Sequence, residues 1–120
     1  MQSFELAVDS LEQALQSPPR LQKSWGHIVG QRATEVAEAL TAESPVAMDS
    51  WLSARAGNLE RERSTLLTRL AVLGTLLAES PDLEPVRDSL RRLAGDVRRH
   101  HQRVNDLTYD ALALDVGGSE

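Results

Sequence analysis

The residues that could bind a metal or move a proton are few in this chain. There are no cysteines, and the three histidines are His27, His100 and His101. A di-metal site in a helical bundle needs Glu-x-x-His pairs on facing helices, and none occurs; the nearest acidic residue at helical spacing is Asp96, four positions before His100. One histidine and one aspartate are too few for zinc, which normally takes at least three protein ligands. The sequence therefore predicts no metal site.

Motifs for nucleophilic or phosphoryl chemistry are also missing. Neither G-x-S-x-G nor G-x-x-x-x-G-K-[ST] occurs. Acidic residues such as Glu60, Glu62 and Asp88 alternate with arginines at helical spacing, which is typical of a solvated face with local ion pairs. We therefore expect a protein that is not an enzyme, with no catalytic residues and no cofactor.

His100 occupies a position in an otherwise apolar helical seam. We expect it to be a partly buried, hydrogen-bonded core histidine rather than a ligand. A protonated imidazole in such a seam would have to be desolvated. The sequence alone thus predicts that His100→Leu raises the melting temperature more at about pH 6 than at about pH 8.

Four arginines of the same helix form two pairs seven residues apart: Arg91, Arg92, Arg98 and Arg99. They occupy the b and c positions of the seam, so all four are expected to project from the outer face, away from the core. There they could dock an acidic surface of a partner. The alternative is simple solvation of an exposed helix face.

Composition favours helices. Of 120 residues, 41% are hydrophobic and only 3% aromatic, so the core must be built from aliphatic stripes, which suit helices better than strands. The net charge of -5 argues against nucleic-acid binding. No run of about 18 apolar residues occurs, and Met1 to Glu5 lack the basic and apolar regions of a signal peptide. We expect a soluble cytoplasmic protein without membrane insertion.

Prolines divide the chain into helices. Ser17-Pro18-Pro19, Ser44-Pro45 and Ser80-Pro81-Asp82 mark the boundaries, and at the third we expect Asp82 to cap a helix with Pro85 in its first turn. The expected helices span roughly residues 3–16, 20–42, 45–79 and 83–115, in one domain over 1–116 with a frayed tail at 117–120. The third has Leu52, Leu59, Leu66 and Leu73 seven residues apart, and the fourth has an unbroken three-four seam from Leu83 to Leu114. The predicted fold is an all-α, elongated antiparallel helical bundle or coiled coil of three to four helices.

Three features together resemble the FlgN-type flagellar export chaperones. They are a long helix, the run Arg61-Glu62-Arg63-Ser64-Thr65-Leu66-Leu67 inside a second long helix, and a C-terminal amphipathic helix with Asn105-x-Leu107. The resemblance spans roughly residues 20–115. Members are small, acidic, all-helical cytoplasmic proteins that hold hook-associated proteins before type III export. This chain departs from them at Pro18 and Pro19, which interrupt the N-terminal helix, and in its short extension after Leu114.

The resemblance implies that the last helix binds the C-terminal helix of an export cargo, with the export machinery as a further partner. The residues concerned are Val104, Leu107, Ala111, Leu112 and Leu114, which form an apolar stripe, and Tyr109 as an exposed anchor beside it. The alternative for all six is ordinary core. For the whole protein, the alternative function is a self-associating coiled coil, structural or regulatory, without a cargo. A third possible function is an enzyme with a cofactor in the bundle core.

Overall fold

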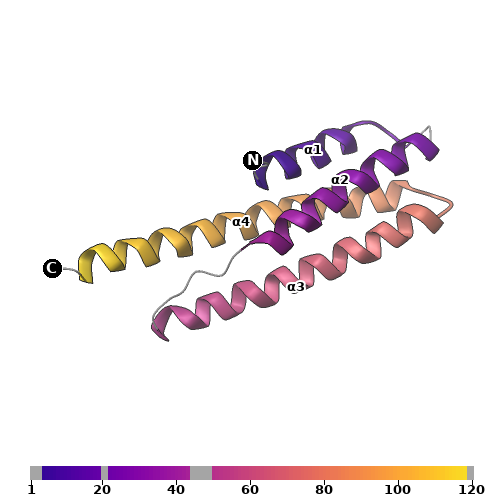
Figure 1. Cartoon of the computed structure of the whole chain (residues 1–120). Coiled ribbons are helices and arrows are strands. Elements are labelled where there is room, and N and C mark those ends of the chain that lie inside the picture. The colour runs from indigo at the N-terminus through magenta and orange to yellow at the C-terminus, as the bar shows by residue number, and fades with distance from the viewer. Residues whose placement is uncertain (1–3, 20–21, 44–49, 119–120) are drawn as a thin grey trace.

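The computed structural model describes residues 4–19, 22–43 and 50–118, and these residues form four helices and no strand. The helices are α1 (Phe4–Gln16), α2 (Gln22–Ala42), α3 (Ser50–Glu79) and α4 (Glu84–Gly118). They run alternately up and down, and the molecule measures 60 × 24 × 18 Å (Figure 1). The predicted all-α helical bundle is confirmed.

The helix ends agree with the sequence in part. Asp82 Oδ1 accepts the main-chain N–H of Glu84 at 3.2 Å, and Pro85 lies in the first turn of α4, as predicted. The predicted end of this helix at residue 115 is wrong, because α4 continues to Gly118. A glycine weakens a helix by about 1 kcal/mol but leaves its hydrogen-bonding groups intact, so it does not by itself stop the helix. The predicted helix start at Pro45 and the last two residues of the tail lie outside the described residues.

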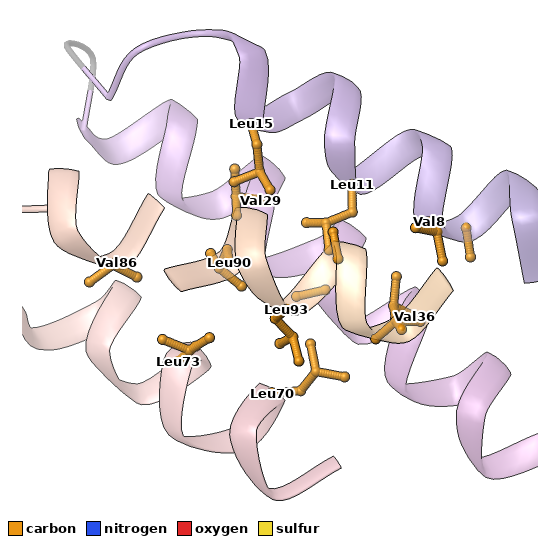
Figure 2. Packing of buried hydrophobic residues seen from close by; sticks show 14 of the residues in the cluster. Val8, Leu11, Leu15, Val29, Val36, Leu70, Leu73, Val86, Leu90 and Leu93 are labelled. Carbon is orange, nitrogen blue, oxygen red and sulfur yellow. The ribbon is translucent and has the colours of Figure 1, made fainter. Parts of the chain in front are cut away.

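The main core lies where all four helices are present. α1 packs on α2 and α4, and α3 packs on the same two helices, so the four form a ring around one core. Figure 2 shows the aliphatic side chains that meet there, among them Val8, Leu11 and Leu15 of α1, Val29 and Val36 of α2, Leu70 and Leu73 of α3, and Val86, Leu90 and Leu93 of α4. The three-four spacing of each helix therefore turns one stripe toward a shared centre.

A second, smaller core lies where only α3 and α4 are described. Leu52 of α3 is buried against Leu107 and Ala111 of α4, with Ala56 and Leu59 half-buried beside them. We call residues 50–59 of α3 with residues 104–118 of α4 the two-helix end. Figure 1 shows that α1 and α2 do not extend alongside it.

Ion pairs fix the register of α3 on α4. Three arginine–carboxylate pairs cross between the described parts of the two helices: Arg55 Nη1 to Asp110 Oδ2 at 3.0 Å, Arg103 Nη2 to Glu62 Oε2 at 2.5 Å, and Arg69 Nη1 to Asp96 Oδ2 at 2.7 Å. The partners step by seven residues along α3 and by seven in the opposite direction along α4. Exposed pairs contribute only about 0.2–1 kcal/mol each, so their main effect is to select one antiparallel register.

Glycines inside the helices open a groove between α2 and α3. The groove has a volume of about 840 Å³ and is lined in part by Gly26 and Gly30 of α2 and Gly74 of α3. A Cβ atom built on Gly30 or Gly74 would meet no atom within 4 Å. Gly30 and Gly74 therefore do not serve close approach of the two helices.

We predict that Gly30→Ala and Gly74→Ala each stabilise the protein. Neither residue has a positive φ, and each Cβ points into open space, so only the helix propensity changes. The gain should be about 0.5–1 kcal/mol for each substitution. Urea unfolding monitored by circular dichroism measures it, and a loss of stability in both variants would show that the groove is closed in solution.

Candidate functional site

The most unusual polar group in the described residues is His100, whose side chain is buried in the middle of α4. Its Nδ1 lies 2.7 Å from Glu62 Oε1 of α3, and its Nε2 lies 2.7 Å from Glu43 Oε1, one residue beyond the end of α2. The expected hydrogen-bonded core histidine is confirmed. An ionised carboxylate oxygen only accepts hydrogen bonds, so both contacts are made together when the ring carries two N–H groups, that is, when it is protonated.

Electrostatics favour that protonated ring. Burial lowers the pKa of His100, but the hydrogen bonds and the negative charges of Glu43 and Glu62 outweigh burial and raise the pKa above its ordinary value. For Glu62, burial raises the pKa, while Arg103 and His100 more than compensate and hold the pKa of this carboxyl below its ordinary value. The cluster therefore favours a protonated ring between the carboxyl groups of Glu43 and Glu62.

Further contacts tie this cluster to all four helices. Arg63 of α3 donates from Nη1 to the main-chain oxygen of Glu43 at 2.9 Å, which satisfies a carbonyl just past the end of α2. His101 Nδ1 lies 3.9 Å from Glu43 Oε2, and both atoms are buried without a hydrogen-bond partner. The ring of Phe4 in α1 stacks on His101 with centroids 4.2 Å apart. Glu43 is thus the point at which the end of α2 is held by α3 and α4.

The cluster does not form a metal site. Within the three described ranges, no group of three or more histidine, aspartate or glutamate side chains is arranged to hold a metal ion. Both ring nitrogens of His100 are already engaged by carboxylates, and its side chain is only 1% exposed. The ring is therefore not accessible to a substrate.

The contacts of His100 reverse the pH effect that we expect for His100→Leu. No sequence pattern places Glu43 beside the ring, and the carboxylates of Glu43 and Glu62 are the groups that favour the protonated form. A group whose pKa is raised by folding stabilises the protein below its unfolded pKa, and this contribution disappears as the pH rises through the folded pKa.

We predict that His100→Leu destabilises the protein by about 1–3 kcal/mol at about pH 6, because the buried carboxylate of Glu43 loses its partner. The loss should become smaller as the pH rises toward about 9 and the wild-type ring loses its proton. Urea unfolding at both pH values measures the difference. His27→Leu is the matched control, since His27 is exposed on α2. An equal pH dependence of stability in both variants would contradict the role of the contacts between His100 and the two carboxylates.

The four arginines predicted on the outer face of α4 do not lie together. Arg91, Arg92 and Arg99 are exposed, with Arg92 bonded to Ser89 and Arg99 paired with Asp96 of the same helix. The expectation that Arg98 projects from the outer face is wrong. Its Nε donates to Glu12 Oε1 of α1 at 3.1 Å, and Asp9 pairs with the same guanidinium. Burial lowers its pKa less than these carboxylates raise it.

Arg87, which sequence reasoning missed, also holds α1. Its Nε donates to the main-chain oxygen of Leu15 at 2.7 Å and its Nη2 to that of Gln16 at 3.0 Å. These carbonyls belong to the last turn of α1, where no helical N–H reaches them. Arg87 therefore caps α1 from a distant helix, with Trp25 Nε1 donating to the next carbonyl, that of Ser17, at 2.8 Å.

The predicted partner-binding stripe divides into two sets. Leu107 and Ala111 are buried in the small core of the two-helix end, and Val104 is half-buried. Tyr109 and Leu112 are 75% and 60% exposed. The side chain of Leu114 lies outside the described residues. The stripe thus contributes both to the internal core and to an apolar surface.

Two signals in the sequence could have located more of these contacts. The heptad spacing of Arg55, Glu62 and Arg69, and of the opposite charges Asp96, Arg103 and Asp110, predicts an antiparallel pair. The position of Glu43 offers no such signal, because it follows a helix end and lies 57 residues from His100.

In comparisons with known proteins, no family model, no curated protein and no solved structure matches this chain.

Proposed function

We propose that this protein binds an amphipathic helix of a protein partner at its two-helix end, in the manner of an export chaperone. The observation that supports this is the exposure of Tyr109 and Leu112 on α4, within the two-helix end that also contains the small core of Leu52, Leu107 and Ala111. Exposed aromatic residues are typical anchors of protein interfaces.

The geometry suits an added helix. In the main core each helix packs against two neighbours, whereas in the two-helix end α3 and α4 pack mainly against each other among the described residues. A partner helix laid on α4 at this end would extend the bundle by burying Leu112 and Tyr109. Helix-in-groove binding of this kind uses apolar anchors three or four residues apart, and Tyr109 and Leu112 are three apart.

The nature of the partner rests on the resemblance to FlgN-type chaperones. It makes the C-terminal helix of a flagellar hook-associated protein the first candidate cargo, with a cytoplasmic location and the export machinery as a second partner. In the described part of the chain, no helix has the length and apolar character to cross a membrane. The exposed Arg91, Arg92 and Arg99 are a secondary candidate for an acidic surface of such a partner, and Arg98 is excluded because it is bound to α1.

A second copy of the chain is the alternative occupant. If the two-helix ends of two copies packed against each other, each copy would cover Tyr109 and Leu112 of the other. Four helices would then surround one core there, as they do in the main core. This arrangement corresponds to the self-associating coiled coil and needs no cargo.

We predict that Leu112→Asp weakens binding of a C-terminal helical fragment of a hook-associated protein at least about tenfold, the effect of losing one buried apolar anchor. Val72→Asp is the matched control, since Val72 is 53% exposed on α3 beside the main core and should not affect binding. Isothermal titration calorimetry measures both affinities, and circular dichroism should show that both variants remain folded.

Sedimentation at several concentrations tests the alternative with the same variants. A dimer that Leu112→Asp dissociates, with no binding of the fragment, would favour self-association. A monomeric wild-type protein that binds no fragment would contradict both assignments of the two-helix end.

A further inference from the structure

The polar contacts at the end of α2 centre on one buried ring, beside the apolar packing of Leu40 in the main core. His100 of α4 contacts Glu43, directly after α2, and Glu62 of α3, each at 2.7 Å. We propose that His100 is a proton-controlled clamp: protonated, it holds the C-terminal end of α2 on the α3–α4 pair, and deprotonated, it loosens that end.

The two carboxylates do not depend on the ring equally. Glu62 also pairs with Arg103, and its side chain is 31% exposed, so it keeps a cation when the ring is neutral. Glu43 is only 10% exposed, and His101 Nδ1 at 3.9 Å is the only other positively chargeable group near its carboxylate among the described residues. Arg63 donates to the main-chain oxygen of Glu43, and its charge is paired with Glu60. From α1, the uncharged ring of Phe4 stacks on His101.

A neutral ring weakens the Glu43 contact in either tautomer. If the remaining proton is on Nδ1, an unprotonated Nε2 faces the carboxylate of Glu43, and the hydrogen bond is lost. If it is on Nε2, the bond remains, but a neutral donor replaces a charged one, and charge-assisted bonds are roughly twice as strong. In both cases the end of α2 is held less firmly.

α3 stays in place when the clamp opens. Its ion pairs Arg55–Asp110 and Arg69–Asp96 with α4 involve no histidine. The aliphatic core holds α2 from Val29 to Leu40, so what the ring controls is the end that follows Leu40. Loosening is therefore confined to the last turn of α2, which borders the two-helix end. If the proposed function is correct, this turn would regulate how much surface a partner helix can reach; the clamp itself requires no partner.

Amide exchange in the free protein, measured by NMR, tests the clamp. Between about pH 6 and about pH 9 the protection factors of residues 39–42 should fall about fivefold or more relative to those of residues 30–34 in the same helix. The Cε1 resonance of His100 should shift over the same range. Protection factors are corrected for the intrinsic exchange rate at each pH. The ratio of the protection factors of residues 39–42 to those of residues 30–34 therefore reports local opening alone.

Two matched variants locate the effect. Glu43→Gln should make the ratio independent of pH, because it removes the charge that the ring holds, whereas Glu38→Gln, on the exposed face of the same helix, should retain the wild-type pH dependence. A ratio that does not change while His100 loses its proton would overturn the proposal. A ring that keeps one protonation state throughout the range would overturn it equally.

Discussion

α3 and α4 lie antiparallel with Arg55, Glu62 and Arg69 opposite Asp110, Arg103 and Asp96, and this register decides which side chains meet elsewhere in the bundle. A shift by one residue would turn the seam of each helix away from the other and separate every charge pair. With the register as observed, Glu62 comes opposite both Arg103 and His100, and Leu52 comes opposite Leu107. The buried ring and the small second core are thus consequences of one pairing.

α1 and α2 are attached to this pair in different ways. Aliphatic side chains hold both of them along the main core, but the polar contacts at their ends come from arginines and histidine of α3 and α4. Arg87 and Arg98 bind α1 through carbonyls and carboxylates, whereas Arg63 and His100 bind the residue that follows α2. Arginine remains charged at all ordinary pH values, and histidine does not. Among the described contacts at the ends of α1 and α2, the cation that can lose its charge between neutral and alkaline pH therefore lies at the end of α2.

The sequence was sufficient for the helices and their buried faces, because the three-four spacing from Leu83 onward specifies a stripe without reference to any partner. The sequence was insufficient to predict the contacts of Arg98 and His100. A heptad position gives the direction in which a side chain leaves its own helix, but not which residues of other helices lie opposite. Arg98 occupies a predicted outer position, yet α1 supplies Asp9 and Glu12 there. His100 occupies a predicted core position, yet Glu43 reaches it from a helix end that no periodicity locates.

The distribution of core along the molecule relates stability to binding. Side chains from four helices surround the main core, so opening it exposes many apolar residues at once, whereas the two-helix end buries only Leu52, Leu107 and Ala111 among its described residues. Local stability follows the amount of buried apolar surface, so the two-helix end belongs to the less stable part of the bundle. Tyr109 and Leu112 are exposed in this less stable part. A helix added there would therefore stabilise the part of the bundle that has the most to gain, and this gain in the protein's own packing would contribute to the affinity.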